Sequence, residues 1–166
     1  STNTVKETID LMGATFPHHV YLSPDKSLMA VAITATDLTG GHGGHGGASG
    51  NYMVHIINTV TGAHEHELTC AKMPHNAVFS PDGSELWVSQ SDIAKSQVLI
   101  YNTSDWSLKT TVNVGKGLSE VTFAADGSMA FATNTDDGTV SIIDPSSKMI
   151  HATVTVGMNP VGAWPA

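Results

Sequence analysis

Apolar residues occur along the chain in short runs rich in Val, Ile and Thr, and Gly, Asp, Asn and Pro separate these runs. Examples are residues 98–101, 139–143 and 153–156. Runs of this length and composition, bounded by turn residues, predict β-strands. Helical spacing of apolar positions is hard to find, so the pattern predicts an all-β protein.

Three segments repeat one order of elements around a turn, namely 17–25, 74–83 and 118–127. Two of them carry Ser-Pro-Asp, in which Pro presets the turn backbone, and two carry a following Gly that accepts positive φ. The expected order in each repeat is strand, turn, strand, loop, strand, turn, strand. Four strands in about 40 residues are typical of one blade of a β-propeller.

The third repeat also resembles a known family. Residues 126–134, 138–144 and 152–157 are similar to the YVTN-type repeat, whose relatives are the propellers of cytochrome d1 nitrite reductase and nitrous oxide reductase. Residues 71–115 resemble the same repeat, and 14–70 do so with an insertion. The resemblance implies a β-propeller of four-stranded antiparallel blades. It says little about function, because propellers host many activities.

The whole chain, 1–166, is predicted to form a single partial propeller domain. Its segments are full blades at 17–70, 75–114 and 119–156, an outermost strand of a preceding blade at 4–11, and the start of a further blade at 158–164. Closed propellers need about four to eight blades. We expect either a homodimer whose chains share one ring, or a ring completed by a further segment. The homodimer is favoured because an open blade edge promotes aggregation.

Composition excludes several classes of function. The formal net charge is −8 at pH 7, so a basic stripe for nucleic acid is missing. No apolar run approaches the ~18 residues that span a bilayer. The single Cys70 forms no internal disulfide. Few Lys, many Thr, Ser and Gly, and a start at Ser1 predict an exported protein with its leader removed, periplasmic or otherwise extracytoplasmic.

Candidate metal ligands gather on one face of the predicted propeller. Successive connections of an antiparallel meander alternate ends, so the connections between blades and the loop between the second and third strand share the top face. That face receives Met12, His18, His19, His42, His45, Cys70, Met73, His75 and Met158. His18 and His75 occupy the same repeat position, so we expect them to converge on the propeller axis.

Imidazole, thioether and thiolate together suit copper, whereas imidazole alone equally suits zinc or nickel. The resemblance to nitrous oxide reductase implies copper as well, because that family holds a copper cluster with His at the top of its propeller. Only His18, His19 and His75 match those positions, and the family's full His set is missing. The predicted metal ligands are His18, His19, His75, His42, His45, Cys70 and Met73. Two alternatives stay open: a Pro-His pair that only bonds a neighbouring loop, and Cys70 as a core residue.

Two further His-rich segments have competing interpretations. The Gly/His-rich insertion 40–50 is either a loop that folds over an ion or partner, or a linker between strands. Its formal Gly-x-Gly-x-x-Gly is no dinucleotide site, because no helix follows. Strand alternation places His64 and His66 on one side of an outer strand, with Leu68 and Cys70. This His pair is either a metal-binding pair or a solvated strand edge.

Three functional hypotheses follow. The first is an exported, copper-binding propeller that uses the top-face His residues. The second is half or a fragment of a propeller oxidoreductase, and the third is a metal-free scaffold that holds a protein partner on the top face. No Gly-x-Ser-x-Gly elbow, phosphate loop or Cys-x-x-Cys-His motif occurs, so enzymatic activity is left open.

Overall fold

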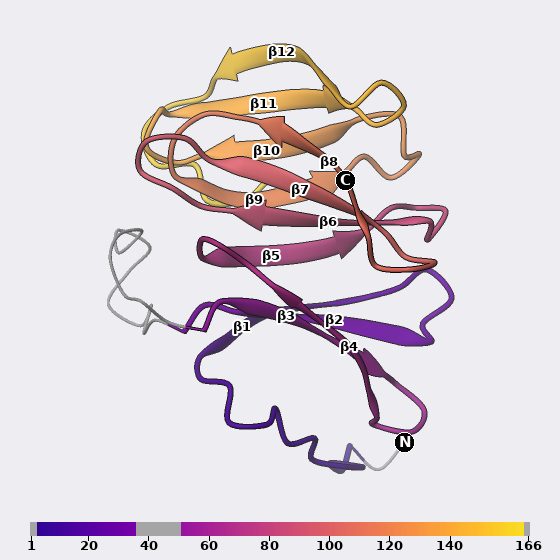
Figure 1. Cartoon of the computed structure of the whole chain (residues 1–166). Coiled ribbons are helices and arrows are strands. Elements are labelled where there is room, and N and C mark those ends of the chain that lie inside the picture. Colours follow the sequence, from indigo (N-terminus) through magenta and orange to yellow (C-terminus); the bar gives the residue numbers. More distant parts are fainter. Residues whose placement is uncertain (1–2, 36–50, 165–166) are drawn as a thin grey trace.

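The computed structural model describes residues 3–35 and 51–164, and this part of the chain forms twelve strands (Figure 1). The strands are β1 (Pro17–Leu22), β2 (Leu28–Ile33), β3 (Met53–Asn58), β4 (His64–Thr69), β5 (Pro74–Phe79), β6 (Glu85–Gln90), β7 (Gln97–Asn102), β8 (Leu108–Asn113), β9 (Leu118–Phe123), β10 (Ala130–Asn134), β11 (Thr139–Asp144) and β12 (Met149–Thr155). Within these described ranges no helix is long and apolar enough to cross a membrane. The all-β prediction is confirmed.

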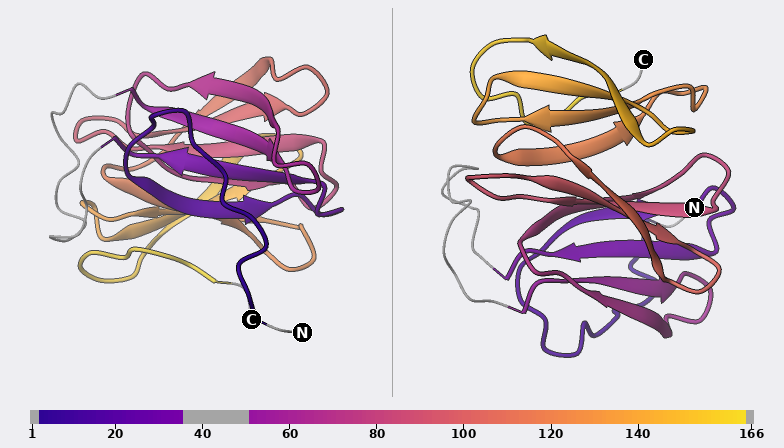
Figure 2. Two further views of the ribbon diagram at one scale, coloured as in Figure 1. Left: turned by 90° about the horizontal axis from the view of Figure 1, so that it is seen from below. Right: turned by 45° about the horizontal axis from the view of Figure 1, so that its top comes forward.

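Consecutive strands form three antiparallel four-stranded sheets, which we call the first (β1–β4), second (β5–β8) and third (β9–β12) blade. The blades stack face to face in chain order (Figures 1 and 2). The first strand of each later blade packs on the first two strands of the blade before it, so β1, β5 and β9 lie innermost. The arrangement is a propeller-like fold of three fanned blades that do not close into a ring.

Two apolar cores hold the blades together. The core between the first and second blades includes Val54, Ile56 and Leu86, with Trp106 packed against it. In the core between the second and third blades, Trp87 is fully buried and meets Phe123 edge to face, with 4.9 Å between ring centroids. Burial of such large side chains is the main stabilising term between blades.

The repeated Ser-Pro-Asp turn is a local hydrogen-bonded unit on the bottom face, at the end of the blades opposite the top face. Asp82 Oδ1 accepts hydrogen bonds from Ser80 Oγ at 2.5 Å and from the Ser84 amide at 3.1 Å. These donors favour the ionised carboxylate and lower the pKa of Asp82 to about 2. Gly83 takes φ +74°, which the turn requires and which Gly adopts without strain.

The segment before β1 differs from its prediction. Residues 3–16 contain no strand, so the expected outermost strand at 4–11 is wrong. This segment, the N-terminal strap, runs along the face of the first blade that points away from the second (Figure 1). Ile9, Leu11 and Ala14 pack there on a small core that includes Ile33 and Ile57. No strand of the described residues pairs with this segment, so the burial of its apolar side chains decides its path.

The segment after β12 lies where the innermost strand of a further blade would start. Ser89 Oγ donates a hydrogen bond to the Ser119 carbonyl at 3.1 Å, which ties the second blade to the third. Thr133 occupies the position of Ser89 in the next repeat, and its Oγ1 donates to the Val161 carbonyl at 3.0 Å. Val161 therefore stands in the place of Ser119 on the next blade, as the repeat pattern predicts.

Candidate metal centre

Each innermost strand carries a β-bulge at the same repeat position. In β1, Pro17 pairs with Ile33 while Val20 pairs with Val31, so one extra residue lies between these pairs. The same irregularity occurs in β5 between Pro74 and Ala77, and in β9 between Leu118 and Val121. A bulge re-aims the side chains beside it and is common next to functional sites. The paired residues at the three bulges are His18–His19, His75–Asn76 and Ser119–Glu120.

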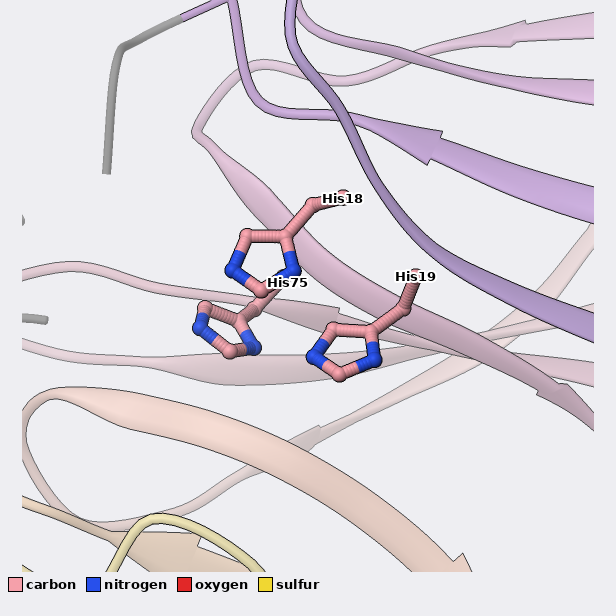
Figure 3. Close-up of side chains that lie close together, drawn as sticks. All are labelled: His18, His19 and His75. Atoms are coloured by element: carbon pink, nitrogen blue, oxygen red, sulfur yellow. The ribbon is translucent and has the colours of Figure 1, made fainter. Parts of the chain in front are cut away.

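The bulges bring three imidazoles together, which we call the axial cluster: His18, His19 and His75 (Figure 3). In a regular strand, consecutive side chains point to opposite faces. Here the rings of His18 and His19 are stacked with centroids 4.3 Å apart. His75 lies on the second blade, and its ring centroid is 4.4 Å from that of His18 and 5.2 Å from that of His19. One ligating nitrogen from each residue lies within 4.8 Å of the others, so one ion could be held by all three.

The axial cluster is anchored at one side and reachable at the other. His75 is 0% exposed, whereas His18 and His19 are only partly buried. Asn76, next to His75, binds β9 through both ends of its amide, donating to the Val121 carbonyl at 2.9 Å and accepting from the Val121 amide at 3.1 Å. This link between blades fixes the position of β5 and therefore of His75.

Glu120 adds a carboxylate that the sequence analysis did not identify. Its Oε1 lies 3.2 Å from His19 Nε2, and its side chain is 5% exposed. Burial raises the pKa of Glu120. Its Oε2 has no hydrogen-bond partner among the described residues. A buried carboxylate needs a compensating positive charge, and a bound cation would supply one. The repeat alignment could have identified Glu120, because this residue holds in the third repeat the place that His19 holds in the first.

The other predicted ligands fall in different places. Cys70 lies in the core between the first and second blades, where burial raises the pKa of its thiol to about 12. Cys70 is 5% exposed and packs among apolar side chains there. Met73 is buried two residues before His75, and Met158 is 94% exposed. His42 and His45 lie outside the described residues.

His64 and His66 do not share a side of β4, contrary to the prediction from alternation. A register shift places His66 opposite Ile56 but His64 opposite Ile57, and these two isoleucines face opposite sides of the sheet. His66 stacks on Trp106 with 5.6 Å between centroids. His64 instead meets His55 on the face beneath the N-terminal strap.

Comparison with known proteins shows the fold. No family model and no curated protein matches the chain, so the resemblance to the YVTN-type repeat is not confirmed. Hydrazine synthase from Kuenenia stuttgartiensis has a similar structure, with a TM-score of 0.71 and 18% sequence identity. The match covers 95% of this chain and 41% of that one. Since 712 chains of solved structures match, the likeness supports a propeller-like architecture and no particular activity.

The donor set of the site is three imidazoles with one adjacent carboxylate. This combination suits zinc, copper and nickel. The separation of 3.2 Å between His19 Nε2 and Glu120 Oε1 is compatible with two donors on one ion, because ligands about 2 Å from a metal lie about 3 Å apart. The arrangement can thus hold a transition-metal ion at the inner end of the blades.

Proposed function

We propose that this protein is an exported metal-binding propeller protein that holds one copper ion at His18, His19 and His75. The observation that supports it is the approach of three imidazoles from two blades to within 4.8 Å. Glu120 serves as a fourth donor or balances the charge of the ion. The function is to bind the ion, with no catalytic step assigned.

Copper is favoured by general coordination chemistry. For a given set of nitrogen and oxygen donors, Cu²⁺ binds more tightly than the other divalent first-row ions, including Ni²⁺ and Zn²⁺. The axial cluster is rich in imidazole and offers a carboxylate at His19. Imidazole and carboxylate donors both suit Cu²⁺. The proposed site therefore needs no thiolate ligand from Cys70, which is buried elsewhere.

The proposal is tested by titrating the purified, metal-free protein with Cu²⁺ in a calorimeter. One equivalent should bind, and Zn²⁺ should compete only weakly. His18→Ala should weaken this binding by at least about 100-fold. Loss of a residue that only supports a metal ligand already lowers affinity about 10–100-fold, and loss of the ligand itself should lower it at least as much. His151→Ala is the matched control, because His151 is exposed on β12. Equal uptake by wild type and His18→Ala would refute the assignment.

We also propose that a second copy of the chain completes the ring. The outer face of the third blade supports this, because Phe131, Val140 and Ile142 are only partly buried there and Val154 is 44% exposed. A propeller blade normally buries both faces against neighbours. The mass in solution, from light scattering, should be twice that of one 17.3 kDa chain. A strictly monomeric protein at all concentrations would contradict this.

A further inference from the structure

A second imidazole pair lies on the outer face of the first blade, beneath the N-terminal strap. We call His55 and His64 the outer-face pair. His64 Nε2 lies 2.8 Å from the Asp10 carbonyl, which can only accept, so this nitrogen carries the proton. In the neutral ring, His64 Nδ1 is then unprotonated and can only accept a hydrogen bond. Because His55 Nδ1 lies 3.2 Å from it, the proton between them belongs to His55.

This chain of hydrogen bonds leaves His55 Nε2 as an unprotonated nitrogen. His55 is 1% exposed, and its Nε2 has no hydrogen-bond partner among the residues that the structure describes. Burial and the neighbouring His64 lower the pKa of His55, in agreement with a neutral ring. A buried lone pair of this kind is costly unless a donor or a cation reaches it.

A cavity of about 190 Å³ adjoins this imidazole. His55 and Glu67 line it as a directly opposed pair across β3 and β4. Met53 lines it from two residues earlier on the same strand, and Met12 lines it from the strap. The strap bends at this point, with Asp10 Oδ1 accepting from the Met12 amide at 2.9 Å and with Gly13 at φ +79°.

We infer that this cavity binds a soft monovalent cation, Cu⁺ or its analogue Ag⁺, through His55 Nε2 and the thioethers of Met12 and Met53. Thioether and imidazole donors are those that Cu⁺ selects. Neutral donors and a single positive charge keep the cost of burial low, and Glu67 at the rim balances the charge. The site uses no residue of the axial cluster, so it stands independently of the proposed function.

The test uses the full chain labelled with [methyl-¹³C]methionine and titrated with Ag⁺. The methyl signals of Met12 and Met53 should move at the first equivalent. Those of Met149 and Met158, which are exposed at the far end of the molecule, should not. Uniform shifts of all methionines, or none at Met12 and Met53 after one equivalent, would overturn the inference and leave the cavity to solvent.

Variants separate this site from the axial cluster. Met12 is 74% exposed, so Met12→Leu should fold normally yet lose the first equivalent of Ag⁺. Met158→Leu is the control and should retain it. His18→Ala should keep the Met12 and Met53 shifts while losing Cu²⁺ uptake, and Met12→Leu should do the reverse. If Met12→Leu and Met53→Leu both bind Ag⁺ as wild type does, the thioethers are not ligands and the inference fails.

Discussion

The first blade contributes to two histidine clusters that differ in the groups beside their imidazoles. In the axial cluster, a bulge places His18 beside His19, and the neighbouring blades add His75 and Glu120. In the outer-face pair, His64 is already bonded to the Asp10 carbonyl and to His55. Proximity of imidazoles is therefore a weak guide to chemistry; the direction of each lone pair, and the charge beside it, decides what can bind.

The two clusters also differ in the hardness of their surroundings. The axial cluster adjoins a buried carboxylate, which favours a divalent ion. The outer-face cavity is lined by Met12 and Met53 beside His55, and its carboxylate, Glu67, is exposed rather than buried. Thioether and imidazole donors favour a soft monovalent ion. If the comparison is right, each cluster can be disabled without loss of the other.

The largest effect should come from removing two axial ligands at once. The double variant His18→Ala, His19→Ala leaves His75 as the single imidazole of the axial cluster. Specific Cu²⁺ uptake should vanish, since one imidazole cannot compete with buffer and water for the ion. Elemental analysis after dialysis measures it. Retention of one copper per chain in this variant would break the comparison by placing the ion elsewhere.

The next effect concerns Glu120. Glu120→Gln keeps the size of the side chain but removes its charge next to His19. Affinity for Cu²⁺ should fall about 10–100-fold, as is usual for a group that supports or completes a metal site. Glu65→Gln on β4 serves as the matched control. Identical titrations for wild type and Glu120→Gln would show that the carboxylate takes no part.

A smaller effect is expected at the outer-face pair. His64→Phe keeps a ring at this position but removes the donor to the Asp10 carbonyl, so it should loosen the N-terminal strap. The free energy of unfolding should fall by about 1 kcal/mol, the usual net value of one hydrogen bond. Denaturant titration measures this, and hydrogen exchange of the strap amides should quicken. Cu²⁺ uptake should be unchanged, and a change would mean that the clusters are coupled.

The smallest expected effect concerns pH, because metal release and acid unfolding should depend on different groups. Imidazole must be deprotonated to bind copper, so the ion should leave below about pH 6. The pKa of Asp82 is about 2 in the folded protein, below its ordinary 3.8, so its contribution to stability is complete above that ordinary value and is lost as pH falls through about 2. Asp82→Asn should make the loss of stability in acid smaller, and it should leave metal release unaltered. Asp136→Asn, at a turn on the other face, is the control.

The fold was predictable because its signals are local and repeated. The Ser-Pro-Asp turns and the Val/Ile/Thr runs recur, and the four strands of each blade are consecutive in the chain and pair with one another. Residues 4–11 were predicted to form an outermost strand, but Ile9 and Leu11 pack through their side chains and pair with no strand edge in the described structure. A sequence pattern indicates which side chains are buried more readily than it indicates which strand their backbone pairs with.

The site was predictable only in part. His18 and His75 could be paired because equal repeat positions converge on the axis. Single-residue bulges in β9 and β4 alter the alternation of side chains. For this reason His64 was placed on the wrong side of β4, and Glu120 was missed although it aligns with His19 in the repeat. Neither bulge could be located before the neighbouring strands were placed.

Anomalous diffraction at the copper absorption edge, on crystals of the Cu²⁺-loaded protein, tests the central claim most directly. We predict one strong peak within about 2 Å of a nitrogen from each of His18, His19 and His75, the usual metal–imidazole distance. A peak at His66 or His151, or no ordered copper in a protein whose three axial rings are placed as in Figure 3, would contradict the account.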